Sequence, residues 1–450
     1  HEPEKATEKA KDLVRSAVAK ARLLRPLERP KIPVTPAALV IGGGVSGMTA
    51  AIELAKQGFD VYLVEREPEL GGHLRHIHYT LNGEDPRELL RRLIEEVEGN
   101  PRIKVFKGAE IVEVSGYVGN FETTIRHDGI EEKVKHGAII VATGAELLRP
   151  YGQYLYGEDP RVLTQMELEE LLAKGEFKAR RVVMIQCVGS RVPERPYCSR
   201  ICCAQAVKNA LKIKELSPET EVLVLFRDLR TYGFRELYYR RAREKGVIFA
   251  RYTPERPPEV LREGDKLLVR FYDPATRSEV VAEADLVVLS TAIVPRPDAA
   301  DLAKMLKVPL SQDGFFLEAH VKLRPLDFAS DGIFLCGMAH YPKFIDECIA
   351  QACGAAARAA TLLSKPYLEV EAAVACVDTS RCRGCGRCEE VCEYGAISVV
   401  EEEGRLVARV NEALCKGCGA CSVRCPTGAV RVQHFRPEQI LAQVLAVAAA

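Results

Sequence analysis

The chain has 450 residues, which is enough for two or three domains. Its 63 basic and 63 acidic side chains balance, so no strong overall field favours nucleic acid or an anionic membrane surface. Hydrophobic residues make up 47%, and no apolar run reaches the roughly 18 residues of a membrane span, so we expect a globular protein and not an integral membrane protein.

The first 36 residues predict a helix and then an extended linker. Residues 3–25 are rich in Ala, Lys, Glu and Leu, which favour a helix. Four prolines between residues 26 and 36 favour an extended chain. No signal peptide is visible, but the chain begins with His1, so we expect that the native N-terminus is missing.

A glycine-rich loop follows the first predicted strand, Ala38–Ile41. Gly42, Gly44 and Gly47 form G-x-G-x-x-G between this strand and a helix, and Glu65 ends the next strand. This is the dinucleotide-binding fingerprint in its required context. The first glycine permits a tight turn, the second lets the pyrophosphate approach, and the third lets helix and strand pack closely. We expect Glu65 to accept hydrogen bonds from a ribose.

Three later features favour FAD over NAD. They are a Gly-Gly pair at 71–72, a strand at 138–144 that ends in Ala-Thr-Gly, and a stretch at 332–337 that precedes a helix. Together they resemble the motifs of the two-dinucleotide flavoprotein superfamily, to which thioredoxin reductase belongs. The chain has Met338 after Gly337, where that superfamily usually has Asp. The candidate FAD contacts are Gly42, Gly44, Val45, Ser46, Gly47, Glu65, Arg66, Gly71, Gly72, His73, Leu74, Ala142, Thr143, Gly144, Gly337, Met338 and Lys343.

A second strand–loop–helix unit starts at Val182 but lacks a second fingerprint. Only Gly189 remains of the glycines, so we expect no pyrophosphate there. Four cysteines occupy the loop instead: Cys187, Cys198, Cys202 and Cys203. Their spacing leaves open a [4Fe–4S] cluster, a zinc site or a set of redox or buried thiols. Both adjacent cysteines can be ligands if the helix starts between them. We call residues 187–203 the cysteine loop.

Eight further cysteines near the C-terminus form two runs of C-x2-C-x2-C-x3-C, and Pro426 follows the second. This pattern is typical of a protein that holds two [4Fe–4S] clusters, in which the fourth cysteine of each run crosses to the other cluster. Zinc knuckles or disulfides are less suited to two triple runs. The predicted ligand sets are Cys382, Cys385, Cys388 and Cys425 for one cluster, and Cys415, Cys418, Cys421 and Cys392 for the other.

Several strings resemble the A subunit of heterodisulfide reductase. They include CVGSR…YCSRICCAQAVKNALKIKE, ALVIGGGVSGMTAAIELAKQGFDVYLVEREPELGG, KATEKAKDLVRSAVAKA and CGMAHYPKFIDECIAQA. The resemblance implies that the cysteine loop binds a third [4Fe–4S] cluster, that the protein binds FAD, and that it is cytoplasmic. Larger family members carry an inserted ferredoxin after the Gly-Gly pair and an N-terminal segment. Here residues 73–137 contain no cysteine, so we expect a shortened form with three clusters.

The expected fold class is α/β: a thioredoxin-reductase-like two-dinucleotide-binding flavoprotein fold plus a C-terminal α+β bacterial-type 2[4Fe–4S] ferredoxin domain. The expected domains are 1–36 (N-terminal helix and linker), 37–150 (FAD-binding Rossmann, first part), 151–295 (second Rossmann-like domain with the cysteine loop), 296–369 (FAD-binding, second part), 370–433 (ferredoxin) and 434–450 (C-terminal helix).

The expected function is electron transfer within a heterodisulfide-reductase-like oxidoreductase complex. The chemistry would occur at FAD, which exchanges electron pairs and single electrons, so no side chain is assigned as catalytic. A flavin with two electron routes, through the ferredoxin domain and through the cysteine loop, permits flavin-based electron bifurcation, as the resemblance implies. The implied partners are other subunits of such a complex and a hydrogenase, dehydrogenase or ferredoxin, with the chain as a homodimer inside a hetero-oligomer. One alternative is an NAD(P)H-dependent flavoprotein similar to the small subunit of glutamate synthase, and the other is a non-catalytic electron-wiring subunit.

Other reactive residues have simpler explanations. Cys336 ends a buried strand beside the expected flavin, so a small core residue is expected there, with a redox thiol as the alternative. Cys348 and Cys353 lie five residues apart on different faces of a helix, and both are expected to be packing residues. His340 and Lys343 could lie near the flavin pyrimidine and favour its anionic form, or could be solvated residues at a helix start.

Overall fold

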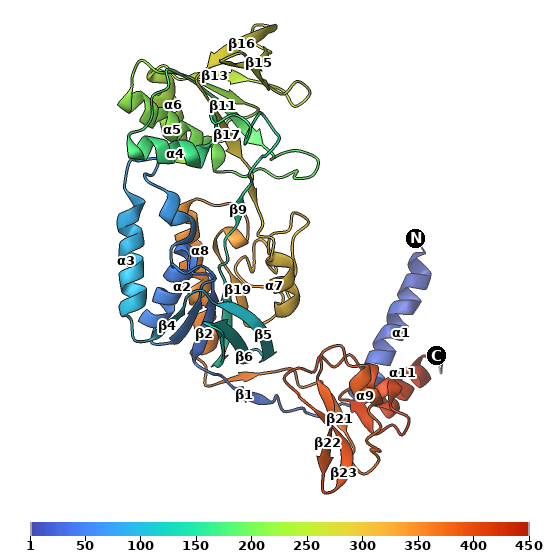
Figure 1. Ribbon diagram of the computed structural model, residues 1–450. Helices are drawn as coiled ribbons and strands as arrows, with labels where there is room; N and C mark the ends of the chain where they lie inside the picture. The colour runs from blue at the N-terminus through green and yellow to red at the C-terminus, as the bar shows by residue number, and fades with distance from the viewer. Residues whose placement is uncertain (1, 449–450) are drawn as a thin grey trace. The chain divides into compact units, whose positions relative to one another are not determined.

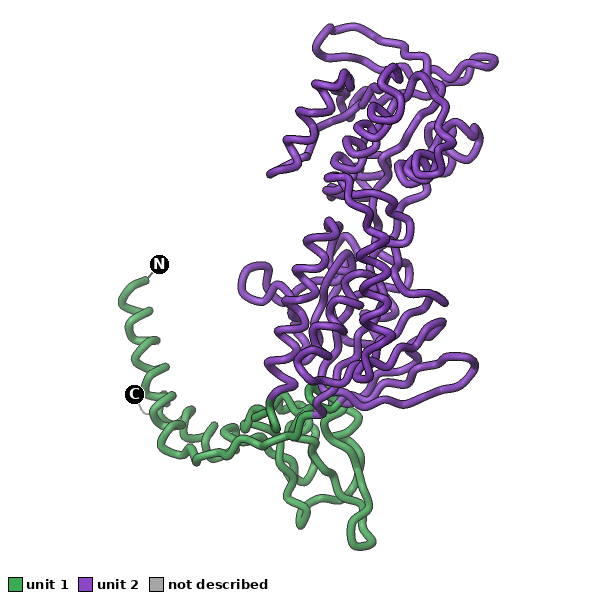
Figure 2. Tube along the Cα trace, turned by 90° about the vertical axis from the view of Figure 1, so that its left-hand side faces the viewer, with its two compact units in different colours: residues 1–34, 117–120, 365–450 green, residues 35–116, 121–364 purple. Residues whose placement is uncertain are grey.

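The computed structural model describes residues 2–448, which fall into two units (Figure 2). The larger unit comprises residues 35–116 and 121–364, and the smaller one comprises residues 1–34, 117–120 and 365–450. Residues 1 and 449–450, which include the end of the predicted C-terminal helix, lie outside the described residues.

The first lobe of the larger unit is built on a five-stranded parallel sheet in the order β19-β8-β2-β3-β4 (Figure 1). The strands are β2 (Ala37–Ile41), β3 (Asp60–Val64), β4 (Ile103–Phe106), β8 (Ala138–Val141) and β19 (Ile333–Leu335). Strands β2, β8 and β19 are buried along their whole length, as expected for apolar runs covered on both faces. Helices α2 (Val45–Lys56) and α8 (Ile345–Leu363) pack against each other and against these strands.

Two helices and an antiparallel sheet complete this lobe. Helix α3 (Pro86–Gly99) packs on α2 and β4, and helix α7 (Ala299–Leu306) precedes β19. An antiparallel sheet is formed by β5 (Glu110–Tyr117), β6 (Asn120–His127) and β7 (Ile130–His136).

The second lobe repeats the parallel design with the order β10-β17-β11-β12-β13. The strands are β10 (Val162–Thr164), β11 (Arg181–Val188), β12 (Glu221–Phe226), β13 (Ile248–Arg251) and β17 (Leu286–Thr291). Helices α4 (Gln165–Lys174), α5 (Cys202–Leu216) and α6 (Glu236–Glu244) accompany them, with an antiparallel sheet of β14 (Glu259–Glu263), β15 (Lys266–Asp273) and β16 (Ser278–Ala284). The short pair β9 (Glu146–Leu147) and β18 (Ile293–Val294) runs where the chain passes between the lobes (Figure 1).

The smaller unit contains the cysteine-rich repeat. Its elements are α1 (Pro3–Ala21), β1 (Lys31–Pro33), β20 (Tyr367–Glu369), β21 (Ala375–Val377), α9 (Arg387–Glu390), β22 (Ile397–Glu402), β23 (Arg405–Val410), α10 (Ala420–Arg424), β24 (Val430–Val432) and α11 (Pro437–Ala448). Helix α1 packs on α11, and β1 pairs with β20. Cysteine side chains form a large part of the core of the repeat, as expected for a domain built around its clusters.

The predicted elements differ from the structure in four details. The first helix ends at Ala21 rather than near residue 25, and the linker after it includes β1. The sequence of residues 265–293 predicts two strands, whereas the structure has β15, β16, β17 and the start of β18 there. Helix α5 begins at Cys202 and not between the two adjacent cysteines, so both lie in its first turn.

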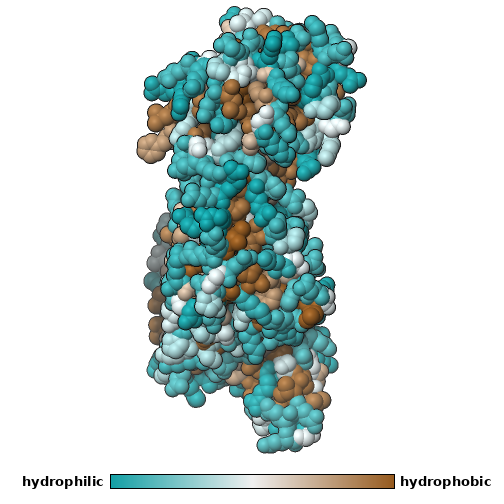
Figure 3. Space-filling model, turned by 60° about the vertical axis from the view of Figure 1, so that its left-hand side comes forward, coloured by the Kyte–Doolittle hydropathy of each residue, from teal (hydrophilic) through white to brown (hydrophobic). Residues whose placement is uncertain are grey.

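In the part of the chain from residue 2 to residue 448, no helix is long and apolar enough to cross a membrane. On the face drawn in Figure 3, hydrophilic residues predominate and apolar residues lie in separate patches.

Candidate flavin and iron–sulfur sites

The fingerprint loop leaves an open space at its middle glycine. Gly42 has φ +108°, and a Cβ there would lie 2.5 Å from the carbonyl oxygen of Ala142. A Cβ on Gly47 would overlap the carbonyl oxygen of Gly42. By contrast, a Cβ on Gly44 would meet no atom within 4 Å. The outer glycines are therefore needed for packing, whereas the middle one borders space that a pyrophosphate could fill.

Helix α2 begins directly after this space. Gly44 is its N-cap residue, and no side chain caps its first turn. The N–H groups of Val45 and Ser46 are therefore among those that a helix leaves free at its start, where an anion is favoured.

Glu65 is held by the backbone of its own site. Its Oε2 accepts a hydrogen bond from the Gly43 N–H at 2.6 Å, and its Oε1 accepts one from the Glu67 N–H at 2.8 Å. The carboxylate thus fixes the fingerprint loop, and its remaining lone pairs are those that a ribose would use. Arg66 points elsewhere and pairs with Asp298 at 3.0 Å.

The Gly-Gly motif lies beside the fingerprint. The Gly71 N–H donates to the Gly43 carbonyl oxygen at 2.9 Å, and Gly44 and Gly71 form a β-bridge. His73 Nε2 lies 2.6 Å from the carbonyl oxygen of Ala145, just after the Ala142-Thr143-Gly144 turn, and Leu74 is buried. The structure therefore brings these predicted contacts together at one edge of the sheet.

The late glycine motif reaches the same edge. Gly337 has φ +71°, and a Cβ there would overlap the hydroxyl oxygen of Ser46 at the start of α2. Met338 packs with Ala145 in a small apolar cluster. Because β2, β8 and β19 are parallel, their carboxyl ends meet here, which is where open α/β sheets bind ligands.

The segment after Gly337 is buried. His340 is 7% exposed and Lys343 is 5% exposed, so the solvated alternative is wrong for both. Burial lowers the pKa of Lys343 to about 7, and its Nζ lies 2.9 Å from the centre of the Tyr341 ring. Burial, and then the charge of Lys343, lower the pKa of His340 to about 4. His340 is therefore neutral near pH 7, and Lys343 can gain or lose a proton there.

Two polar residues that the sequence did not reveal hold this segment. Gln351 Oε1 accepts from the Gly337 N–H at 2.8 Å, and its Nε2 lies 2.8 Å from His340 Nδ1. Glu318 Oε2 lies 2.8 Å from His340 Nε2. A neutral His340 with its proton on Nε2 satisfies both contacts. No local motif marks these residues, because their partners are 11 to 22 residues away in the chain.

The cysteine loop starts at a strained strand end. The pairing of β11 with β17 shifts register between Ile185 and Val188, and Cys187 has φ +64°. Such a bulge re-aims a side chain, and left-handed backbone is unusual for a residue other than Gly. Arg191 and Arg200 have φ +59° and +60°. Strain of this kind is concentrated at functional sites.

The four thiols of the cysteine loop are close enough to influence one another. Cys187, Cys202 and Cys203 are buried and Cys198 is half-buried. Burial raises the pKa of Cys187 to about 11, and the charges of Cys203 and Cys198 add to the effect. A hydrogen bond between Cys202 and Cys203 raises the pKa of the former and lowers that of the latter. Among residues 2–448, no three His, Cys, Asp or Glu side chains have the spacing of a single-ion site.

Arginines lie next to these thiols. Arg191 pairs with Asp228 at 2.7 Å and lowers the pKa of Cys187, while Arg230 lowers that of Cys203. Arg227 donates to the carbonyl oxygen of Arg191 at 2.8 Å. Soft thiolate donors beside fixed positive charge suit an anionic iron–sulfur group.

In the smaller unit, one set of four cysteines surrounds a hollow. Cys382, Cys385, Cys388 and Cys425 line one small hollow that is partly open to solvent. Cys425 comes from the second run, as the predicted crossing requires. For the other set, burial raises the pKa of Cys421 to about 11, and Cys415, Cys418 and Cys392 contribute to the rise. The structure thus groups the cysteines as the two predicted ligand sets.

Backbone N–H groups point at three of these sulfurs. Ala408 donates to Cys382 at 3.4 Å, Ala396 to Cys392 at 3.2 Å and Ala375 to Cys415 at 3.3 Å. Such bonds stabilise thiolates and tune cluster potentials.

The cysteines outside the predicted ligand sets differ in burial. Cys336 and Cys348 are buried, as expected of packing residues. Cys353 is exposed, so its prediction as a packing residue is wrong.

Comparisons with known proteins agree with this architecture. Residues 36–185 match the pyridine nucleotide-disulphide oxidoreductase family, and residues 381–429 match the 4Fe-4S dicluster domain. The fold resembles thioredoxin reductase of T. acidophilum (TM-score 0.51, 17% identity, 74% of this chain and 99% of that one) and of Lactococcus lactis (TM-score 0.52, 18% identity, 73% and 99%). The predicted thioredoxin-reductase-like fold with a C-terminal ferredoxin domain is therefore confirmed.

Among the relatives that match nearly the whole chain, two illustrate the family. One of the two iron-sulfur A subunits of the CoB–CoM heterodisulfide reductase of Methanopyrus kandleri is 41% identical over 98% of this chain and 82% of its own length. The A subunit of the H2:CoB-CoM heterodisulfide,ferredoxin reductase of Methanothermobacter marburgensis is 38% identical over 99% and 81%. The first alignment spans 542 positions, more than the 450 residues here, so that relative has intervening segments that this chain lacks. The chain belongs to the A-subunit family of heterodisulfide reductases, as an electron-transfer oxidoreductase component with a flavin-type domain and a 4Fe–4S dicluster domain.

Proposed function

We propose that the chain binds FAD at the first parallel sheet and holds three [4Fe–4S] clusters, two in the ferredoxin domain and one in the cysteine loop. It would pass electrons between FAD and the other subunits of a heterodisulfide-reductase-like complex. The observation that carries this proposal is the convergence of four thiols at the carboxyl end of β11, where a second nucleotide would bind in this fold.

The second sheet supports an iron–sulfur site better than a nicotinamide site. Strand β11 is central, between β17 and β12, so the loop after it occupies the expected nucleotide position. At Gly44 the space beside the glycine is open, whereas a Cβ on Gly189 would overlap the side chain of Leu148. After β11, thiols and arginines lie where the fingerprint loop after β2 has open space beside its glycine. This contrast disfavours the NAD(P)H-dependent alternative.

The residues that would hold FAD are the predicted contacts at the first sheet. The α2 N-terminus and the space beside Gly44 would receive the pyrophosphate, and Glu65 the ribose. Gly337, Met338 and Lys343 would lie toward the flavin ring. When bound, FAD would supply the exchange between electron pairs and single electrons. Lys343, with its pKa near 7, would place a positive charge near the flavin ring, and this charge would depend on pH.

The ligand sets of the clusters are part of the proposal. The cysteine loop would use Cys187, Cys198, Cys202 and Cys203. The ferredoxin clusters would use the two crossed sets, with Cys425 and Cys392 as the crossing ligands.

The partners follow from the relatives and are likewise proposed. Other subunits of a CoB–CoM heterodisulfide-reductase-like complex would receive electrons, and a hydrogenase, dehydrogenase or ferredoxin would supply or accept them. Two exits from one flavin, through the ferredoxin domain and through the cysteine loop, are the layout that electron bifurcation needs. A homodimer inside a cytoplasmic hetero-oligomer completes the proposed assembly.

Iron and flavin analysis of the anaerobically purified protein tests this proposal. Three clusters predict about twelve iron atoms per FAD, whereas about eight would remove the cluster of the cysteine loop. A parallel mixing experiment with NADH or NADPH separates the alternative. Rapid bleaching of the flavin by either nucleotide would contradict the proposed absence of a nicotinamide site.

A further inference from the structure

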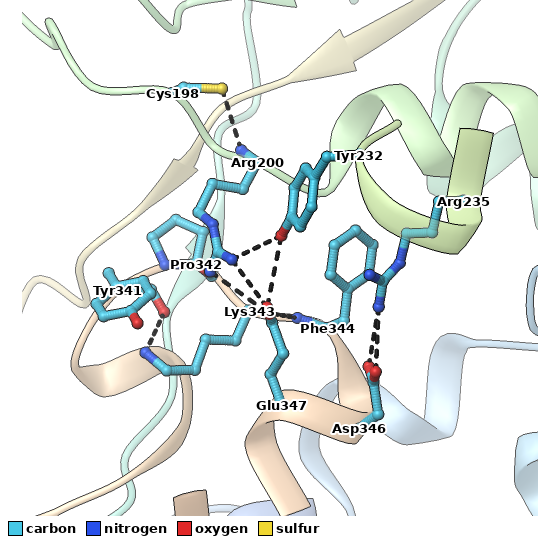
Figure 4. A network of polar contacts seen from close by, with 10 residues as sticks. All are labelled: Cys198, Arg200, Tyr232, Arg235, Tyr341, Pro342, Lys343, Phe344, Asp346 and Glu347. Carbon is cyan, nitrogen blue, oxygen red and sulfur yellow. Dashed lines mark hydrogen bonds and ion pairs between the residues drawn. The ribbon is translucent and has the colours of Figure 1, made fainter. Parts of the chain in front are cut away.

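Arg200 belongs to the cysteine loop through its backbone. It lies between Cys198 and Cys202, has φ +60°, and donates its N–H to the sulfur of Cys198 at 3.3 Å (Figure 4). A change in the position of Arg200 would therefore move two of the four cysteines.

The guanidinium of Arg200 reaches the start of α8 in the other lobe. It donates to the Pro342 carbonyl oxygen at 2.9 Å, to Glu347 Oε1 at 2.8 Å and Oε2 at 3.4 Å, and to the Tyr232 hydroxyl at 2.6 Å (Figure 4). Glu347 also accepts from the Phe344 N–H at 2.9 Å, so this carboxylate fixes the first turn of α8 as well. The fork of two bonds to one carboxylate is specific to arginine.

This contact is partly shielded from water. The Arg200 and Glu347 side chains are 29% and 30% exposed, and the guanidinium lies 5.3 Å from the Tyr341 ring centre and 5.7 Å from that of Tyr232. An ion pair in this setting holds its geometry better than a fully solvated pair.

The segment that Arg200 contacts is the one that carries the late glycine motif. Residues 337–347 contain Gly337, Met338 and Lys343. A second, independent set of contacts involves the same two regions, because Tyr197 and Ile201 of the cysteine loop pack against the buried cluster of Ala145, Ile293 and Phe315 on which Met338 also packs. The Tyr197 hydroxyl also donates to the Ile293 carbonyl oxygen at 2.8 Å on β18.

We propose that Arg200 is a positioning residue that fixes the cysteine loop against the flavin-side segment 337–347. The effect of this contact on electron transfer rests on the proposed function, because a fixed separation between flavin and cluster sets the rate of electron transfer. The contact itself is a property of the chain. Arg235 offers a matched comparison, since it joins the same lobes through Asp346 at 3.1 Å and stacks on Phe344 at 3.6 Å, but lies outside the cysteine loop.

The test uses the anaerobic holoprotein and five variants. Four address the contact: Arg200→Gln, Glu347→Gln, the double variant, and Asp346→Asn as the control. The fifth, Cys202→Ala, identifies the signal of the cysteine loop. Hydrogen–deuterium exchange reports on residues 197–203 and 338–347. We expect Glu347→Gln to speed exchange about tenfold in the distant cysteine loop, and Arg200→Gln to do the same at the start of α8. The double variant should add little to either, because both single changes remove one interaction.

A second readout separates positioning from loosening of the fold. The flavin is reduced by a flash, and the absorbance of the protein is then followed over time. The part of the absorbance change that is missing in Cys202→Ala reports on the cluster of the cysteine loop. Glu347→Gln should slow this change about tenfold, while iron content and the cluster midpoint potential stay as in the wild type. Equal effects in Asp346→Asn, or exchange that rises only beside the substituted residue, would overturn the proposal.

The two hypotheses can fail separately. If iron analysis finds no cluster in the cysteine loop, the proposed function fails, and the exchange measurement alone decides whether Arg200 joins the two segments. If Arg200→Gln loses iron, the Glu347→Gln variant decides whether the contact positions the cysteine loop, because Glu347 lies outside that loop.

Discussion

The carboxyl ends of the two parallel sheets have similar backbone topology but are followed by loops of different composition. After β2, three glycines form a loop with open space beside Gly44, which leaves room for a bound ligand. After β11, a bulge, left-handed residues and four cysteines fill the corresponding place. Under the proposed function, the same topology supplies a ligand position in both lobes, and the loop side chains decide which ligand takes it.

The largest expected effect separates the roles of the glycines. Gly47→Ala would force a methyl group into the carbonyl oxygen of Gly42, so we expect a loss of several kcal/mol in the free energy of unfolding and little folded, flavin-bearing protein. Gly44→Ala meets no protein atom, so its apoprotein should melt within a few degrees of the wild type. Its FAD affinity should fall at least tenfold, because the methyl group occupies the ligand space.

Thermal melting and FAD titration of both variants check this contrast. Unchanged FAD affinity in Gly44→Ala would show that the pyrophosphate does not lie beside this glycine.

The helix after the cysteine loop is anchored differently, by buried polar pairs. Lys208 on α5 pairs with Glu169 on α4 at 2.6 Å, and the carboxylate is fully buried. Lys208→Met leaves that carboxylate without its cation, so we expect a loss of about 3 kcal/mol in the free energy of unfolding. Urea denaturation measures this loss. Lys212→Met is the control, since the ion pair of Lys212 is with the exposed Glu215, and its loss should change stability by less than about 1 kcal/mol.

A smaller effect concerns pH and the flavin side of the first sheet. Burial lowers the folded-state pKa of Lys343 to about 7 from its usual value of 10.5. Between these values the unfolded chain binds more protons at this residue, so Lys343 makes stability rise with pH over that window. From pH 7 to 9 we expect a contribution of about 2 kcal/mol in the apoprotein. Lys343→Met should lack this rise; parallel pH profiles for the two proteins would contradict the assignment.

Local patterns predicted most of the fold. Gly42, Gly44 and Gly47 were informative because they stood between an apolar strand and a helix, and the crossed cysteine sets followed from a repeat with fixed geometry. The burial of His340 and Lys343 was not predictable, since it depends on elements that fold over them. The Arg200–Glu347 pair joins residues 147 positions apart, and no local signal connects them.

The error at Cys353 has a simple geometric cause. Residues five apart on a helix point in different directions, so α8 can bury Cys348 while Cys353 is exposed. The spacing placed these two cysteines on different faces, but it did not show which face of the helix is buried.

The most direct test of the central claim is anaerobic iron, FAD and EPR analysis of Cys202→Ala beside the wild type. We predict that the variant loses about four iron atoms and one EPR signal, while FAD and the signals of the ferredoxin domain remain. Cys336→Ala, a buried thiol outside every proposed ligand set, should lose no iron. Unchanged iron content and EPR spectra in Cys202→Ala would contradict the account of a cluster at the end of the second sheet.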